Sequence, residues 1–383
     1  MNAPEDNLIY LDNNATTPVD PRVVEAMLPA LREGWGNPSS GHRRGRMAKE
    51  MVEAARAEVA ACLGVLPDEV VFTSGGSESD NWAFAGVVEA RGGGHVVTSA
   101  VEHPAVLATA RALERAGRIR LTVVGVDRTG RTDPDEVARA LAPDTILVSL
   151  MLANNEVGTL QPVAEVAEAC RRRGVLVHTD AAQAVGKVPV DAGTLDVDLL
   201  TVAGHKLYAP KGVGVLVVRR GVAIAPMIHG AGHERGLRAG TENVPGIVGL
   251  GAACELVRRD LAGETPRLAA LRDTLEASLA DGFPGLVLHG HRELRLPNTA
   301  SVAFPGVDAN ELLAALADEV AASAGAACHT GAVHPSAVLT AMGVDAAIAT
   351  ATVRFSLGRF TTAAEIEAGA HLVLAAACVL KRL

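Results

Sequence analysis

Aromatic residues and an excess of positive charge are both lacking in this chain of 383 residues. Aromatics make up 3% of it, and 35 Lys and Arg residues stand against 44 Asp and Glu residues, which gives a formal net charge of −9. A surface that binds nucleic acid needs a basic patch, and single strands also need aromatic stacking platforms. The composition therefore argues against a nucleic-acid-binding protein.

The sequence also lacks a long apolar run. It contains no stretch of about 18 uninterrupted apolar residues, the length that crosses a bilayer. Residues 1–20 carry acids and amides where a secretory signal has a basic and then an apolar segment. From these absences we expect no membrane-spanning segment and a cytoplasmic protein.

Cysteines in disulfide or metal-binding patterns are absent as well. The chain has five cysteines, an odd number, with no CxxC spacing and no cysteine–histidine cluster. Disulfide frameworks use an even set, and structural zinc sites need paired ligands. We therefore expect neither a disulfide framework nor a metal site. The cysteines are Cys62, Cys170, Cys254, Cys328 and Cys378.

Most of the sequence alternates between short apolar runs and longer segments rich in Ala, Glu and Arg. This alternation predicts an α/β fold with helices over a mostly parallel sheet, in which ligands bind at the carboxyl ends of the strands. The predicted strands are Val70–Thr73, His95–Ser99, Arg120–Val126, Thr145–Leu150, Val175–Thr179, Leu199–Val202 and Gly214–Val218. The predicted helices are Ser40–Leu63, Ser77–Arg91, Pro104–Ala116, Asp133–Leu141 and Val163–Arg173.

The pattern changes after Val218, which predicts a second, smaller domain of α+β type. A glycine-rich loop at Gly230–Gly240 leads into a long apolar helix, and a further helix follows from Pro266. Thr362 and Glu365 have the spacing of a capping box that opens the last helix. We expect a large domain of residues 15–260 and a small domain of residues 1–14 and 261–383. The other elements predicted here are a helix near Val244–Leu261, strands at Thr299–Phe304 and Val353–Leu357, and a helix at Ala309–Leu316.

Lysine is scarce, and the position of one lysine is informative. The chain has five lysines, and the pattern predicts that Lys206 ends an apolar strand. A buried ammonium costs free energy unless it has a partner or a function. A partly desolvated lysine has a lowered pKa and serves well as a nucleophilic amine and proton carrier. The alternative is that Lys206 extends to the surface. Lys211, beside a Pro-Lys-Gly turn, is more typical of a structural or exposed position.

Residues 74–81 follow a predicted strand and open a helix. Gly76 lets the backbone approach an anion, and Ser77 adds a hydroxyl donor beside the free N–H groups of the first helical turn. The segment is neither a Walker motif nor a GxGxxG fingerprint. It predicts a phosphate-binding turn, and a Gly-Ser turn that only caps a helix is the alternative.

Two further polar positions follow predicted strands. Asp180 could hold the protonated pyridine nitrogen of a cofactor, and Gln183 could reach a neighbouring ring substituent. His103 could stack on a planar cofactor and move protons near neutral pH. The alternatives are a helix-capping role for Asp180 and a structural role for His103.

Cys328 lies in a segment of small residues that we predict to be a mobile loop. Cysteine prefers burial, so an accessible cysteine beside His329 is unusual. Such access would serve a reactive thiolate. We expect the other four cysteines to be inert core residues.

Taken together, the motifs resemble the cysteine desulfurases, which are class V pyridoxal-phosphate enzymes. The resemblance runs from about Tyr10 to Thr362, and the motifs keep the family's order. It implies a pyridoxal-phosphate fold of type I and a homodimer with active sites at the subunit interface. The Cys328 segment is similar to the group that supplies iron–sulfur cluster assembly. The motifs are Leu11–Pro18, Ser74–Asn81, Glu102-His103, Asn154–Glu156, Asp180–Gln183, Gly204–Lys206, His233–Thr241, Cys328 and Val353–Ser356.

The resemblance also implies what the matching residues do with the cofactor, pyridoxal 5′-phosphate. Lys206 would carry the cofactor covalently and remove the Cα proton of the substrate. Asp180 would pair with the pyridine nitrogen, Gln183 with the ring oxygen, and His103 would stack on the ring. The phosphate would be held by Gly76, Ser77 and His205, together with Thr241 of the partner subunit.

The same resemblance implies L-cysteine as substrate and a sulfur-acceptor protein as partner. Asn155 and Arg354 would position the substrate, Arg354 by a bidentate grip on its carboxylate. Cys328 would take the sulfur as a persulfide while alanine leaves. Two positions depart from the family: Ala203 stands where a serine is frequent, and Ser77 where a threonine is frequent. One lost hydroxyl weakens cofactor binding by at most about 1–3 kcal/mol.

Rival interpretations keep the fold and change the function. The segments around Cys328 and Asn155 also look like those of selenocysteine lyases, in which the leaving selenolate would not need Cys328. Another class V enzyme, such as an aminotransferase, would need a keto substrate and no loop thiol. A catalytically silent scaffold subunit is a third reading, and intact Lys206, Asp180 and His103 argue against it.

Overall fold

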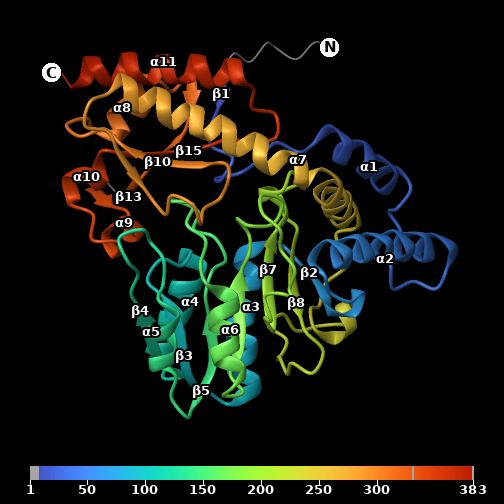
Figure 1. Cartoon of the computed structure of the whole chain (residues 1–383). Helices are drawn as coiled ribbons and strands as arrows, with labels where there is room; N and C mark the ends of the chain where they lie inside the picture. Colours follow the sequence, from blue (N-terminus) through green and yellow to red (C-terminus); the bar gives the residue numbers. More distant parts are fainter. Residues whose placement is uncertain (1–7, 330–331, 382–383) are drawn as a thin grey trace.

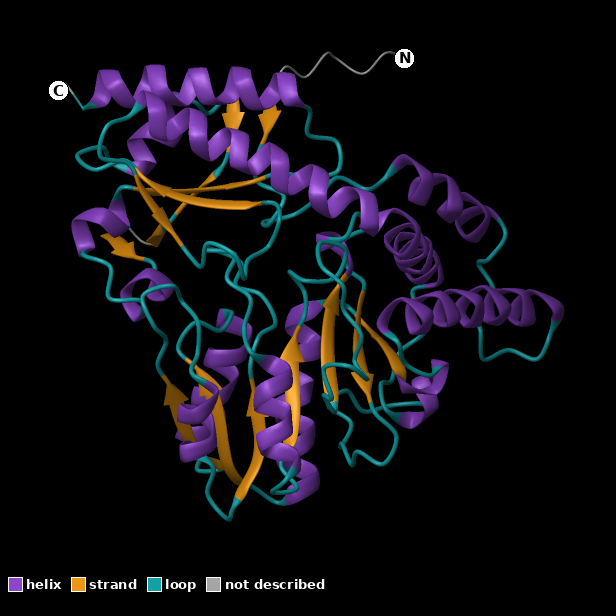
Figure 2. Ribbon diagram, viewed as in Figure 1, coloured by secondary structure: helices purple, strands orange, loops and turns teal. Residues whose placement is uncertain are grey.

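The structure, a computed structural model, describes residues 8–329 and 332–381, with the backbone alone for residues 326–329 and 332–334. Its largest sheet has seven strands in the order β2-β8-β7-β6-β5-β3-β4. Within it β8 is antiparallel to both neighbours, and the other neighbouring pairs are parallel. Helices cover this sheet on both sides, and the C-terminal part of the chain lies beyond its upper edge (Figures 1 and 2). The strands are β2 (Val70–Thr73), β3 (Gly94–Ser99), β4 (Ile119–Val124), β5 (Thr145–Ser149), β6 (Leu176–Asp180), β7 (Leu199–Ala203) and β8 (Gly214–Val218).

The central strands are mostly apolar because both of their faces are buried. Successive side chains of a strand point to opposite faces. Val70 and Phe72 of β2 therefore join one hydrophobic cluster, and Val71 between them joins another. The first cluster is closed by helices α2, α6 and α7 (Val244–Gly282), the second by α3 and α4. The bounds of the covering helices are α2 (Arg43–Leu63), α3 (Gly76–Arg91), α4 (Pro104–Arg115), α5 (Pro134–Ala140) and α6 (Val163–Arg171).

A second, smaller part of the fold is built from the C-terminal part of the chain and the N-terminal strand. Its sheet is antiparallel, with the order β12-β15-β10-β9. Ile9 and Leu11 join the same hydrophobic cluster as Phe304, Phe355 and Ile366. The α/β architecture with a smaller C-terminal α+β part is thus confirmed. The elements are β1 (Ile9–Tyr10), β9 (Val287–His289), β10 (Thr299–Ala303), α8 (Ala309–Ala315), β11 (Val320–Ala321), β12 (Ser323–Ala324), β15 (Thr352–Ser356) and α11 (Ala363–Leu380).

Helix α11 is the described helix that is long and apolar enough to cross a membrane by length and composition alone. Its 18 residues have a mean hydropathy of 1.6. Ile366, Val373 and Ala377 are nevertheless buried in the hydrophobic cluster of this smaller part, and the predicted capping box of Thr362 and Glu365 opens the helix. The apolar face of α11 therefore covers a protein core, beside α7 and α8 (Figure 1).

Three predicted features are wrong in detail. The two helices expected on either side of Pro266 are one continuous helix, α7 (Val244–Gly282), with Pro266 inside it. The loop predicted around Cys328 is instead two short paired strands, β13 (Ala326–His329) and β14 (Ala332–Pro335). Lys206 does not end β7, because the strand stops at Ala203 and residues 204–206 form a 3₁₀ turn. Helices α1 (Pro21–Arg32), α9 (Ala337–Ala341) and α10 (Ala346–Thr350) were not predicted.

Candidate active site

A cavity of about 700 Å³ opens at the carboxyl ends of the parallel strands. Ligands of open α/β sheets bind at this edge, because the loops that follow neighbouring strands converge there. Residues that follow β2, β3, β5, β6 and β7 all line it. The residues that the sequence singled out and the cavity brings together are Gly76, Ser77, His103, Asn155, Asp180, Gln183, His205, Lys206 and Arg354.

Lys206 supplies an amine whose pKa is lower than that of an ordinary lysine. Its Nζ donates hydrogen bonds to the backbone carbonyls of Asn14 at 2.6 Å and Ala15 at 2.7 Å. Burial, with the positive charge of Arg354, lowers its pKa to about 8, against the opposing effect of Asp180 and Asp12. A substantial neutral fraction near pH 8 makes Lys206 a competent nucleophile and base.

Asp180 closes β6 inside a cluster of buried acids. Its Oδ1 accepts a hydrogen bond from the backbone N–H of Ala182 at 2.9 Å, and burial raises its pKa. Burial and the charge of Asp180 raise the pKa of Asp80 well above its usual value, and burial raises the pKa of Glu102 to about 8. Asp80 Oδ1 and Glu102 Oε2 lack hydrogen-bond partners among the described residues. This end of the cavity can neutralise one bound cation.

His103 caps helix α4 at the cavity wall. Its Nδ1 accepts a hydrogen bond from the backbone N–H of Ala105 at 3.1 Å, so the ring proton belongs on Nε2 in the neutral form. Desolvation, with the nearby charge of Lys206, lowers its pKa, and Asp180 opposes this effect. His103 thus has a structural role as the cap of α4, and it also lines the cavity.

The turn between β2 and α3 forms one wall of the cavity. Gly75 has a φ of +150°, and a Cβ placed on Gly214 would lie 2.6 Å from the Cα of Gly75. This close packing leaves the first helical turn, with Gly76 and Ser77, facing the cavity. His205 completes the wall, and its Nδ1 lies 3.1 Å from the Thr16 hydroxyl. Desolvation, with the charges of nearby lysines, lowers the pKa of His205 to about 4.

Thr241 lies outside this cavity in its own chain. It lines a neighbouring cavity of about 240 Å³ that shares Ser74 and Gly212 with the larger one. The single chain therefore brings the other three predicted phosphate ligands together and leaves Thr241 apart.

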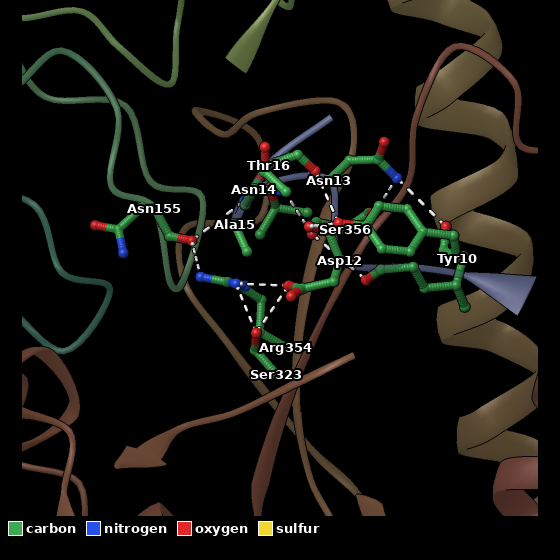
Figure 3. A network of polar contacts seen from close by, with 12 residues as sticks. Tyr10, Asp12, Asn13, Asn14, Ala15, Thr16, Asn155, Ser323, Arg354 and Ser356 are labelled. Atoms are coloured by element: carbon green, nitrogen blue, oxygen red, sulfur yellow. Dashed lines mark hydrogen bonds and ion pairs between the residues drawn. The ribbon is translucent and has the colours of Figure 1, made fainter. Parts of the chain in front are cut away.

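Arg354 reaches the cavity from β15 and is already held by an acid (Figure 3). Its Nη2 donates to Asp12 Oδ1 at 2.8 Å and to the Ser323 hydroxyl at 2.9 Å, and its Nη1 donates to the backbone carbonyl of Asn155 at 3.0 Å. Figure 3 shows the Asn155 side chain pointing away from this cluster. The guanidinium is thus fixed in place, and part of its charge is balanced by Asp12.

Cys328 lies in β13, where it pairs with Val333, and its side chain is outside the described part of the structure. The other four cysteines are free thiols on helices. Cys170 and Cys254 are buried, and Cys62 and Cys378 are half-buried.

Four charged residues near the site were not assigned to it from the sequence. Asp12 and Asp80 lie within two of the motifs that carry the family resemblance. An aspartate at either position does not by itself indicate a role in the site. Lys211, for which the neighbouring Pro-Lys-Gly turn predicts a structural or exposed position, is exposed and also lines the cavity. Lys187 is buried. Its position within the mostly apolar run Ala184–Val190 is the sequence feature that could have indicated this burial.

These groups fit pyridoxal phosphate. A cavity of this size with an amine of lowered pKa, a buried carboxylate and a helix N-terminus offers an attachment point, a partner for a ring cation and an anion site. The Oδ1 of Asp80, which lines the cavity beside Asp180 and has no hydrogen-bond partner among the described residues, marks a wall that can accept a proton donor from a bound group. Fold and site together define a pyridoxal-phosphate-dependent α/β enzyme.

Comparisons with known proteins agree with this assignment. Residues 9–368 match the aminotransferase class V family. The chain is 48% identical to a cysteine desulfurase of Gluconacetobacter diazotrophicus, over 94% of this chain and 91% of the relative. It is 45% identical to the cysteine desulfurase IscS of Methanosarcina thermophila, over 95% and 90% of the two chains.

Solved structures give the same result. A NifS-like protein superposes with a TM-score of 0.90 at 40% identity, covering 98% of this chain and 99% of the other. The structure described as SspA in complex with cysteine gives a TM-score of 0.81 at 34% identity, over 92% and 99% of the two chains. The chain belongs to the class V aminotransferases, and within them to the cysteine desulfurases, which depend on pyridoxal phosphate.

Proposed function

We propose that this enzyme converts L-cysteine to L-alanine and passes the sulfur, through a persulfide on Cys328, to an acceptor protein. The observation that carries the proposal is the single cavity in which Lys206, Asp180 and Arg354 meet. The relatives named cysteine desulfurase and the structural neighbour described with cysteine support the choice of substrate.

The cofactor would be held by the residues that line the cavity. Lys206 would bind it covalently, Asp180 would face its pyridine nitrogen, Gln183 its ring oxygen, and His103 one face of its ring. Its phosphate would be held by Gly76, Ser77 and His205 of the same chain and, in a homodimer, by Thr241 of the partner subunit. Pyridoxal phosphate, when bound, stores the electron pair that the substrate Cα releases.

Substrate binding and proton transfer fall to Arg354, Asn155 and Lys206. Arg354 would bind the cysteine carboxylate, and its pairing with Asp12 holds the guanidinium in place beforehand. The Lys206 amine would take the proton from the substrate Cα, because its lowered pKa keeps part of it neutral.

The Cys328 thiolate would complete the reaction. It attacks the substrate sulfur, the carbon–sulfur bond breaks, and the bonding electron pair remains with the carbon fragment. That fragment takes up a proton and leaves as alanine, while the persulfide stays on Cys328 for transfer to an iron–sulfur scaffold or another sulfur carrier. We further propose a soluble cytoplasmic enzyme with domains of residues 15–260 and of residues 1–14 with 261–383.

Alanine release from L-cysteine tests the proposal. The assay compares the cofactor-loaded wild type with Cys328→Ala, in the presence of a reducing thiol, and we expect alanine from the wild type alone. Full activity of Cys328→Ala would contradict the persulfide role. If neither protein releases alanine, cysteine is not the substrate, and selenocysteine and then keto-acid transamination are the next tests.

A further inference from the structure

Lys187 is a buried lysine that the proposed reaction does not use. It stands at the end of the turn that follows β6, and it is buried, with 6% of its surface exposed. Within the described part of the chain, no carboxylate lies within ion-pair distance of its Nζ. A buried amine without a counter-ion is costly, so its hydrogen bonds indicate what it does.

Both hydrogen bonds of the Lys187 amine go to a single residue, Gln183. The Nζ donates to the Gln183 side-chain Oε1 at 2.8 Å and to its backbone carbonyl at 3.1 Å. The turn itself is fixed by a hydrogen bond from the Thr265 hydroxyl on α7 to the backbone carbonyl of Lys187. Lys187 thus lies behind Gln183, whereas Gln183 lines the large cavity.

The two ends of an amide are not equivalent, and Lys187 distinguishes them. An ammonium or amine N–H can be accepted by the amide oxygen but not by the amide NH₂. With Oε1 held by Lys187, the Nε2 end of Gln183 is turned the other way and donates to the backbone carbonyl of Asn14 at 2.9 Å. The same carbonyl accepts the hydrogen bond of Lys206. A continuous chain of hydrogen bonds therefore joins the buried amine to the catalytic amine.

We propose that Lys187 is a positioning residue that fixes the Gln183 amide with its Nε2 donor toward the ring oxygen of the cofactor. The inference rests on the proposed function, because it deepens the role given there to Gln183. Each amide nitrogen carries two hydrogens, and one of those on Nε2 is taken by Asn14. The second is the donor available to the ring oxygen, and a flipped amide would present an acceptor to an acceptor.

Lys187 acts mainly as a hydrogen-bond donor and less as a charge. Burial lowers its pKa to about 7, and the charges of Lys206 and Arg354 add to the effect. Glu264 and Arg359, of opposite charge, line the small cavity on its other side. Above pH 7 the amine is largely neutral and still donates.

The test is the pH titration of the visible absorbance of the bound cofactor in Lys187→Met. A hydrogen bond to the ring oxygen stabilises its anionic form and so lowers the pH at which the cofactor loses its proton. Loss of the bond should raise that midpoint by about half to one pH unit. The apoprotein of the variant should also bind the cofactor about three- to tenfold more weakly in a fluorescence titration. Methionine keeps the length and apolar volume of the lysine stem.

Three further variants separate positioning from other effects. Gln183→Leu should raise the midpoint, and Lys187→Met added to it should raise it no further, because Lys187 acts through Gln183. Lys187→Arg, which keeps a donor, should recover most of the wild-type midpoint. Lys49→Met, at an exposed position of α2, is the matched control and should change nothing.

Several outcomes would overturn the inference. A wild-type midpoint in Lys187→Met would do so, and so would a shift that adds in full to that of Gln183→Leu, which would indicate a charge effect. If Lys187→Met does not fold, as judged by circular dichroism, Lys187→Leu takes its place with the same expectations. A wild type that binds cofactor but releases no alanine would overturn the proposed substrate and leave this inference standing. A wild type that binds no cofactor would overturn both.

Discussion

At the scale of single residues, the amine of Lys206 sets a pH dependence that the apoprotein should show. Burial lowers its pKa to about 8, and only the neutral amine attacks the aldehyde of pyridoxal phosphate. The rate of cofactor attachment should therefore fall about tenfold per pH unit below that midpoint and level off above it. Stopped-flow absorbance after mixing apoprotein with cofactor measures this rate.

Variants identify the origin of that midpoint. The charge of Arg354 contributes to the lowered pKa after burial itself, so Arg354→Met should move the midpoint to higher pH. Lys206→Ala should show no attachment, and Lys49→Met should behave as the wild type. A midpoint that stays near the ordinary lysine value in the wild type would contradict the described burial of the amine.

The residues that follow strands were the ones that could be predicted to meet. Asp180 directly follows one predicted strand and His103 lies four residues after the end of another, and the ends of parallel strands share one edge, so local sequence sufficed. Lys187 and Asp80 could not be assigned in this way, because Lys187 is buried beside α7 and Asp80 beside β6 and β7, which are distant in the sequence. The pairing of Arg354 with Asp12 joins residues 342 positions apart, which no local pattern indicates.

At the scale of elements, Asp20 connects the start of α1 to the segment between β15 and α11. Its Oδ1 accepts the backbone N–H of Arg22 at 2.9 Å, and its Oδ2 accepts Arg22 Nη2 and Arg359 Nη1, both at 2.7 Å. The carboxylate is 1% exposed. Asp20→Ala should lower the free energy of unfolding by about 3–5 kcal/mol, because it leaves Arg359 unpaired. Asp20→Asn keeps the helix cap and should lose about 1 kcal/mol less.

The stabilising effect of Asp20 should depend on pH. Hydrogen bonds from Arg22, against the effect of burial, hold its pKa well below the ordinary value. A lowered pKa in the folded state means that the stabilisation is complete above the unfolded value, near about 4, and is lost as the pH falls through the folded value. Urea unfolding of wild type and Asp20→Asn at several pH values checks this. A difference that does not shrink in acid would contradict it.

Element boundaries were predictable where turn chemistry is local. Strands β2 and β8 match their predicted bounds, because glycine-rich or charged turns flank each apolar run. Helix α7 was divided wrongly because Pro266 normally ends a helix. Here the helix continues through it, with its first half packed against α2 and α1 and its second half against α11. Tertiary packing therefore outweighs the local signal.

At the scale of the whole molecule, the alternation of strands and helices predicted the class of fold. It did not predict whether one chain contains all residues of the site. Nine of the predicted site residues line one cavity, while Thr241 lines another. Sequence patterns describe how a chain packs on itself, and a residue supplied by a second copy leaves no periodicity in the first. The division of the chain into domains of residues 15–260 and the remainder stays a prediction.

If the partner subunit supplies Thr241, two damaged chains should repair each other. Lys206→Ala removes the amine from its own site, and Thr241→Ala removes a phosphate donor from the partner's site. In a mixed dimer, the site on the Thr241→Ala chain has its own Lys206 and an intact threonine from the other chain. Subunit exchange at equal amounts makes about half of the dimers mixed, each with one intact site, so about a quarter of the wild-type activity should return. Alanine release measures this at a cofactor concentration that fills the intact sites but not the sites that lack the threonine hydroxyl, and a mixture no more active than its separate components would contradict a shared site.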